Sequence, residues 1–309
     1  MVDQPPLSPP PLEASKPRRR APSGSIDSHF HIFGPRDRYP LHPARGYTPS
    51  EKANLDTYLA MAGTLGLERM VIVNPTPYGT DHQCTIDSLE ILGHRRAKAV
   101  AVVNETFTPA MLRDLDQKGF CAARVNSVNS NSTPVEKLRS IVKLVEPLGW
   151  HLEVYVEGQQ LPDLADTLSS LPMPVVIDHM GRVPSDRGIE SLEFRTLLRL
   201  VESGKCWVKL CGYRSSTQGP PYSDMLQPAR KIIETAPERC VWGTDWPHPR
   251  CYGRLLPDDG KLLDLLSEWA PEERQFHRIL VENPARLYRF ETPERQQISS
   301  DSLAERAGS

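Results

Sequence analysis

The sequence alternates short apolar runs with amphipathic helical patterns over most of its length, and this alternation restricts the fold more than any other feature. The runs recur about every 30 residues, which is the length of one strand plus one helix. They are mostly continuous rather than alternating in hydrophobicity, as expected for strands that are covered on both faces. Eight runs have strand character: 25–33, 69–74, 98–103, 120–126, 151–156, 174–179, 206–211 and 240–245.

The segments between these runs have helical periodicity. Leu55, Tyr58, Ala62 and Leu65 fall on one helical face, and Gly66 ends the pattern. Similar patterns cover residues 138–145, 161–171, 192–201 and 262–266. Eight strand-then-helix units in a chain of 309 residues predict a (β/α)₈ TIM barrel of the α/β class. A doubly wound open sheet is the alternative, but the glycine-rich GxGxxG and GxxxxGK[ST] turns typical of it are absent from the sequence.

Both ends of the chain are polar. Residues 1–23 are rich in Pro and Ser, carry the basic cluster 16–20, and have almost nothing apolar to bury, so they predict a disordered tail. A twin-arginine export signal does not fit, because no apolar stretch follows the arginines. Residues 291–309 also predict a polar tail, which leaves 24–290 as the barrel domain.

Composition excludes several classes of partner. The formal net charge of −2 gives no electrostatic reason to bind nucleic acid or an anionic membrane. No apolar run approaches the roughly 20 residues that span a bilayer. The six cysteines include no CxxC pair, and several lie in apolar runs, which is typical of reduced core thiols in a cytoplasmic protein. We therefore expect a cytoplasmic protein that acts on a small molecule; the sequence does not indicate its oligomeric state.

The residues best suited to chemistry lie at the carboxyl ends of the predicted strands, where barrel active sites form. His29 and His31 are two residues apart on the first strand, so both side chains point to one face. Barrel closure places this strand beside the last one, which runs into Asp245. A buried carboxylate needs partners, and the two imidazoles are the best candidates. His179, at the end of the sixth strand, completes the set.

Two chemistries suit these four residues. His29, His31, His179 and Asp245 would make a Zn²⁺ site. They would equally make a metal-free site in which imidazoles donate hydrogen bonds to a carbonyl and the carboxylate acts as a base. The third possibility is that His29 and His31 are core histidines, hydrogen-bonded within the protein and without a role in function. The remaining histidines lie away from the strand ends and receive no role: His42, His82, His94, His151 and His277.

Three arginines lie at or just past strand ends, namely Arg124, Arg182 and Arg214. Arginine commonly clamps a carboxylate through two parallel hydrogen bonds. Any single one of them would serve equally well in a salt bridge, but three together predict an anionic substrate.

Five segments resemble the amidohydrolase superfamily, and more closely its lactonase branch, typified by 2-pyrone-4,6-dicarboxylate lactonase and 4-sulfomuconolactone hydrolase. The resemblance extends from about residue 24 to 290. The segments are Ile26-Asp-Ser-His-Phe-His-Ile-Phe-Gly-Pro35, Val176-Ile-Asp-His-Met-Gly-Arg182, Val241-Trp-Gly-Thr-Asp-Trp-Pro-His248, Pro257-Asp-Asp-Gly260 and Glu282-Asn-Pro-Ala-Arg-Leu-Tyr288.

The resemblance implies a barrel that hydrolyses a small anionic lactone of the kind met in aromatic catabolism. It implies that Asp245 is the general base and that His29, His31 and His179 polarise the scissile carbonyl. The positions expected to contact substrate are Tyr47, Thr76, Arg124, Tyr155, Arg182, Arg214 and His248.

Metal dependence varies in this branch, and the pyrone-dicarboxylate lactonases are similar proteins that work without a divalent metal. Arg124 and Tyr155 stand where a lysine would bridge two metals, so a binuclear site is not expected. We expect no cofactor, with a single Zn²⁺ or Mn²⁺ on the four residues as the alternative.

One departure concerns the substrate. The pyrone-dicarboxylate enzymes carry a second basic residue soon after the strand-four arginine, whereas residues 127–132 contain no Lys or Arg. The resemblance therefore favours a lactone with a differently placed anionic group. A metal-dependent decarboxylase or a sugar-acid lactonase or isomerase on the same barrel is the second hypothesis, and a non-catalytic binding protein is the third.

Overall fold

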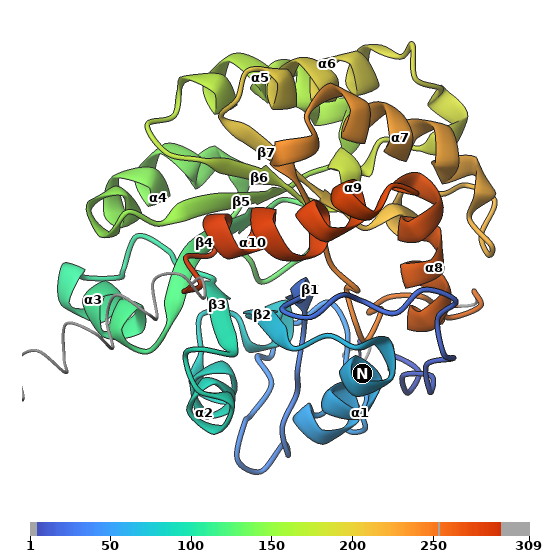
Figure 1. Ribbon diagram of the computed structural model, residues 1–309. Helices are drawn as coiled ribbons and strands as arrows, with labels where there is room; N and C mark the ends of the chain where they lie inside the picture. The colour runs from blue at the N-terminus through green and yellow to red at the C-terminus, as the bar shows by residue number, and fades with distance from the viewer. Residues whose placement is uncertain (1–4, 253, 292–309) are drawn as a thin grey trace, which may run out of the picture.

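In the computed structural model, which describes residues 5–252 and 254–291, eight parallel strands form one sheet in chain order (Figure 1). This order confirms the predicted barrel and contradicts the doubly wound alternative, because the strand order never reverses. The strands are β1 (Ile26–Phe30), β2 (Arg69–Val73), β3 (Ala97–Ala101), β4 (Phe120–Asn126), β5 (His151–Tyr155), β6 (Val175–Ile177), β7 (Cys206–Leu210) and β8 (Cys240–Trp242).

The ring is closed between the last strand and the first by backbone hydrogen bonds just beyond β8. The Asp245 N–H donates to the His29 carbonyl, and the His31 N–H donates to the Trp246 carbonyl, both at 2.8 Å. Gly243 permits this approach, since a Cβ there would lie 2.6 Å from the His29 Cβ and 2.7 Å from its backbone nitrogen. The absence of a side chain at Gly243 thus brings Asp245 against the histidine strand.

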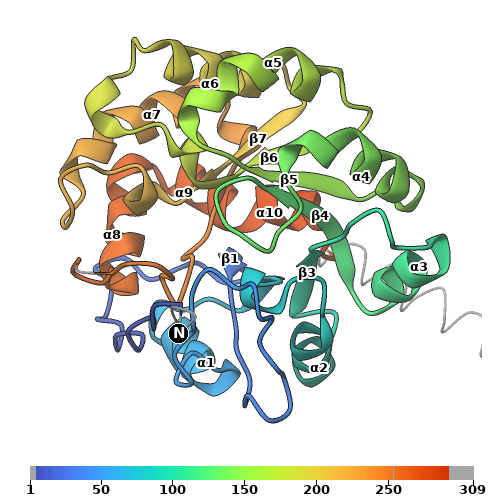
Figure 2. The same ribbon diagram turned by 180° about the vertical axis from the view of Figure 1, so that it is seen from behind.

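Eight helices cover the outside of the ring (Figures 1 and 2). Side chains at the start of several helices accept a backbone N–H of the first turn, as Asn54 does for Thr57 and Ser191 does for Phe194. The helices are α1 (Leu55–Leu65), α2 (Gln83–Leu92), α3 (Pro109–Gln117), α4 (Leu138–Val145), α5 (Leu161–Ser170), α6 (Leu192–Glu202), α7 (Leu226–Thr235) and α8 (Asp259–Trp269).

Two short helices, α9 (Glu273–His277) and α10 (Asn283–Leu287), follow the eighth unit. α10 lies in front of the strands in Figure 1 and behind them in Figure 2. Its end closes the amino-terminal mouth of the barrel, where Leu287, Tyr288 and Phe290 pack in one cluster with Ile26 of β1 and buried residues of β2, β3, β4, β6, β7 and β8. The opposite mouth is left for the site.

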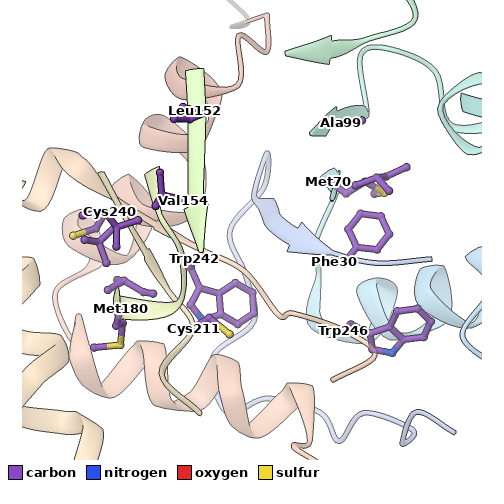
Figure 3. Packing of buried hydrophobic residues seen from close by; sticks show 14 of the residues in the cluster. Phe30, Met70, Ala99, Leu152, Val154, Met180, Cys211, Cys240, Trp242 and Trp246 are labelled. Atoms are coloured by element: carbon purple, nitrogen blue, oxygen red, sulfur yellow. The ribbon is translucent and has the colours of Figure 1, made fainter. Parts of the chain in front are cut away.

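The larger core lies between the strands and the outer helices. Figure 3 shows Trp242 beside Cys211, and Phe30 beside Met70. The Phe30 ring stacks on Tyr58 of α1 with centroids 3.6 Å apart. All six cysteines are buried and free of disulfides, as predicted. Within the described residues, every helix is too short or too polar to cross a membrane.

The amino-terminal segment differs from the disordered tail that its composition predicts. Residues 5–23 follow a defined path: Leu7 and Ser8 pair with Thr48, residues 15–19 lie beside α8 and α9, and Ala21 bonds Leu65 at the end of α1. The Ser15 N–H donates to Asp258 at 2.9 Å, Arg18 pairs with Asp264 at 3.3 Å, and the Arg19 guanidinium lies 4.0 Å from the centre of the Phe276 ring. A prediction of disorder from low apolar content does not take account of such polar and cation–π contacts. The tail predicted for 291–309 lies outside the described residues from 292 onward.

Candidate active site

A cavity of about 780 Å³ opens at the carboxyl ends of the strands. The structure brings nine of the predicted site residues to its wall: His31, Tyr47, Thr76, Arg124, Tyr155, His179, Arg182, Arg214 and Asp245. His29 is fully buried just beneath this wall. His248 does not reach the cavity: its ring packs edge-on against Tyr213, and its Nε2 lies 3.2 Å from Asp259.

Asp245 is held as an anion at the floor of the cavity. Its φ of 58° turns the chain out of the strand direction, so that the carboxylate meets the residues of β1 and β7. Oδ2 accepts hydrogen bonds from the Tyr213 hydroxyl and from the Arg214 Nε–H, both at 2.6 Å. Burial, the largest single influence, opposes ionisation, but the Arg214 guanidinium and the neighbouring histidines together outweigh it and hold the pKa of Asp245 well below its usual range. Oδ1 instead faces Nε2 of His29 at 3.6 Å and of His31 at 3.5 Å.

His29 is a neutral imidazole that presents an N–H to Asp245. Its Nδ1 lies 2.9 Å from the Lys209 ammonium, which can only donate, so the ring proton is on Nε2. Burial first, and then the charge of Lys209, lower the pKa of His29 well below its ordinary value.

His31 has the opposite tautomer. Its Nδ1 lies 2.8 Å from the Val73 carbonyl, which can only accept, so this nitrogen carries the proton. The other ring nitrogen, Nε2, lies 3.4 Å from the Nε2 of His29. Two histidines that are equivalent by spacing are therefore chemically different.

His179 follows β6 with a φ of 50°, and its ring lies 4.7 Å from that of His29. Its Nε2 is 4.0 Å from Oδ2 of Asp245. Burial lowers the pKa of His179 to about 3, so this ring is also neutral. Its Nδ1 has no hydrogen-bond partner among the described residues, which leaves its tautomer open to a bound molecule.

Each predicted arginine already has a carboxylate partner within the protein. Arg124 Nε donates to Asp178 at 2.8 Å. Arg182 Nε donates to Glu157 at 3.0 Å, and Arg214 is the partner of Asp245. Arg182 Nη1 also donates to the Tyr155 hydroxyl, and Arg214 Nη1 to the Pro249 carbonyl, both at 2.9 Å. All three arginines line the cavity while they organise its wall.

Two further arginines, Arg250 and Arg254, line the cavity from the loop after β8. Arg250 contacts Asn129 Oδ1 and the Val128 carbonyl, so it lies against the 127–132 stretch that lacks a basic residue. The sequence analysis missed it because the loop path that carries Arg250 to this stretch has no periodic signature.

The sequence analysis also assigned no role to the charges in the middle of two strands. Lys209 of β7 and Glu153 of β5 are fully buried, and their Nζ and Oε1 atoms are 2.8 Å apart. Lys209 also lies 3.0 Å from Asp178 Oδ1. A charged residue within an apolar strand run could have indicated this pair, because a buried charge in a closed barrel needs a partner of opposite charge.

Among the residues that the structure describes, two groups of side chains have ligand atoms within 4.8 Å of one another: His29, His179 and Asp245, and His29, Glu153 and Asp178. Neither fits a divalent metal. A neutral imidazole has one lone pair, and that of His29 faces Lys209. The second group surrounds the Lys209 ammonium itself, and in the first the Arg214 guanidinium already neutralises the carboxylate.

The family model described as amidohydrolase matches residues 26–290. Because this match covers most of the chain, the protein belongs to the amidohydrolase family, and the resemblance read from the sequence is confirmed.

Similar proteins narrow the comparison. The 2-pyrone-4,6-dicarboxylate hydrolase of Comamonas testosteroni is 37% identical over 286 residues, covering 89% of this chain and 93% of that protein. The 4-sulfomuconolactone hydrolase of Hydrogenophaga intermedia is 36% identical over 272 residues, covering 86% and 89%. The crystal structure of the Agrobacterium tumefaciens protein ATU3138 matches with a TM-score of 0.82 at 29% identity, covering 89% of this chain and 99% of that one.

Proposed function

We propose that this protein hydrolyses the ring ester of a small anionic lactone without a metal ion. The observation that carries the proposal is the Asp245 carboxylate, which has one oxygen fixed by Arg214 and Tyr213 while the other faces two imidazoles at the floor of a large cavity. The likeness to proteins named as pyrone and muconolactone hydrolases supports the same reaction class.

The site residues supply both acid–base and electrostatic catalysis. Oδ1 of Asp245 takes a proton from a water molecule, and the resulting hydroxide adds to the lactone carbonyl. The Nε2–H of His29, joined by His179, donates to the oxygen on which negative charge develops. When the C–O bond of the ring breaks, the proton held by Asp245 passes to the leaving oxygen. General acid–base catalysis contributes about 10²–10⁴-fold, and a single oxyanion donor about 10²–10³-fold.

The charge of the cavity favours an anionic substrate. Five arginines line it, namely Arg124, Arg182, Arg214, Arg250 and Arg254. Three of them are paired with Asp178, Glu157 and Asp245, which leaves Arg250 and Arg254 as the positive excess. Such an excess of one sign attracts the opposite charge. Arg250 supplies a guanidinium beside residues 127–132, so the absence of a basic residue in that stretch still leaves a cation on this side of the cavity.

The alternative functions agree less well with the geometry of the site. A metal-dependent decarboxylase or a metal-dependent sugar-acid lactonase or isomerase would use His29 as a ligand, whereas the lone pair of His29 faces Lys209. A binding protein without catalysis would have no use for a carboxylate that is ionised beside neutral imidazoles.

A pH-indicator assay over a panel of anionic lactones tests the proposal. The panel includes pyrone dicarboxylates, muconolactones and sugar-acid lactones, each with a neutral analogue of the same ring. We expect acid release from at least one anionic lactone, faster than from its neutral analogue and unchanged after dialysis against a chelator. No turnover on the panel contradicts the proposal, and chelator-sensitive turnover restored by Zn²⁺ or Mn²⁺ supports the metal-dependent alternative.

A further inference from the structure

A column of buried polar groups runs beneath the cavity floor toward the closed end of the barrel. The Tyr288 hydroxyl donates to Glu153 Oε1 at 2.8 Å, and the Lys209 ammonium donates to the same oxygen at 2.8 Å. Lys209 then meets His29 Nδ1 at 2.9 Å. All four side chains are fully buried, and only His29 takes part in the proposed chemistry. The column must therefore be explained by what it does to His29.

The arrangement around Lys209 leaves little freedom. An ammonium has three N–H donors and no acceptor. Three acceptors surround it, and they are Glu153 Oε1, Asp178 Oδ1 and His29 Nδ1. Asp178 Oδ1 lies 3.7 Å from His29 Nδ1, which is too far for a hydrogen bond, so Lys209 rather than Asp178 is the partner of this nitrogen.

We propose that Lys209 is a positioning residue that fixes the tautomer of His29. By occupying the lone pair of Nδ1, it places the ring proton on Nε2, where His29 donates a hydrogen bond and cannot ligate a metal. The donation to a lactone carbonyl rests on the proposed function, whereas the tautomer itself does not.

Removing the ammonium should change the tautomer of His29 from Nε2–H to Nδ1–H. In Lys209→Met, the His29 Nδ1 has lost its donor, and the Asp178 carboxylate 3.7 Å away becomes the nearest partner for an Nδ1–H. Nε2 would then present a lone pair toward His31 and Asp245 at the cavity floor. Because this removes a donor to the developing oxyanion, we expect kcat to fall about 10²-fold. KM should change little, because the arginines of the cavity are untouched.

The test measures tautomer and turnover on the full-length chain. Imidazole ¹⁵N chemical shifts, recorded by NMR on ¹⁵N-histidine-labelled protein and assigned with a His29→Gln variant, distinguish Nδ1–H from Nε2–H. We expect Nε2–H in the wild type and Nδ1–H in Lys209→Met. Lys98→Met makes the same change at a partly exposed position of β3 and should alter neither the tautomer nor kcat.

The outcomes separate this inference from the proposed function. An Nδ1–H or doubly protonated His29 in the wild type overturns the role of Lys209, and this needs no folded variant. A folded Lys209→Met protein that keeps Nε2–H, or keeps the wild-type kcat on a turned-over lactone, also overturns it. If the wild type shows Nε2–H and Lys209→Met shows Nδ1–H while no lactone is hydrolysed, the positioning role stands and the lactonase proposal fails.

Discussion

The Arg214 guanidinium lies 2.6 Å from the Asp245 carboxylate, and the two residues work as one unit. Arg214 fixes Oδ2 and keeps the acid ionised, so Oδ1 is the oxygen that takes a proton from water in the proposed mechanism. From sequence, Arg214 was expected to bind the substrate anion and Asp245 to act as a base, as two separate roles. If both proposed roles hold, their pairing couples substrate binding to the protonation state of the base.

Replacing Arg214 should move the acid limb of the pH–rate profile. The guanidinium holds the pKa of Asp245 down against burial, so in Arg214→Gln that pKa rises. A base works only when deprotonated, and activity is lost as the pH falls through its pKa. The acid limb of kcat/KM should therefore move to higher pH. Arg214→Lys, which keeps the charge, should move it less, and an unmoved limb in Arg214→Gln would contradict the coupling.

Gly243→Ala should disrupt the junction of the first and last strands. The new Cβ would lie 2.6 Å from the His29 Cβ, which forces β1 and β8 apart. We expect a loss of about 1–3 kcal/mol in the free energy of unfolding, as for other overpacked sites, together with a fall in turnover. Both are measured by urea unfolding and a lactone assay.

Gly63→Ala is the matched control for that substitution. Gly63 lies within α1, and nothing lies within 4 Å of a Cβ built there. The same chemical change should stabilise the protein by about 0.5–1 kcal/mol through helix propensity. Equal effects of the two substitutions would show that the close approach at Gly243 is unimportant.

Stability should depend on pH through Asp27. Burial raises the pKa of Asp27 to about 6, although it accepts hydrogen bonds from Tyr58 and Thr244. Folding thus favours the protonated form, and this contribution is complete below about pH 4 and lost as the pH rises through about 6. Asp27→Asn cannot ionise, so it should gain about 3 kcal/mol relative to the wild type across that window. Urea unfolding at several pH values measures the difference, and a constant difference would contradict the shifted pKa.

The six cysteines should be protected until the protein unfolds. All six are buried, and burial raises the pKa of their thiols, for example that of Cys121 to about 12 and that of Cys206 to about 11. Little thiolate is then available to react. A thiol-reactive dye should label the native protein slowly and all six residues in guanidinium. Rapid labelling of the native protein would mean that a cysteine is accessible.

The positions of the strands could be predicted because hydrophobic runs are a local property of the chain. Their ends could not. The sixth and eighth runs were expected to reach His179 and Asp245, but β6 ends at Ile177 and β8 at Trp242. The chain turns into positive φ at His179 and Asp245, and such turns have no periodic pattern.

The candidate site was predictable as a set of residues rather than as a set of contacts. Sequence places Arg124 at the end of a strand without showing that it bonds Asp178. It treats His29 and His31 alike, although Lys209 and the Val73 carbonyl give them opposite tautomers. Partners from distant strands decide these features, and barrel closure alone brings such partners together.

The rate of lactone hydrolysis by Asp245→Asn tests the central claim most directly. Asn keeps the shape of the side chain but cannot take a proton from water, so the account predicts a loss of at least about 10²-fold in kcat with the circular dichroism of the wild type. A folded Asp245→Asn protein that hydrolyses the same lactone at a near-normal rate would contradict it.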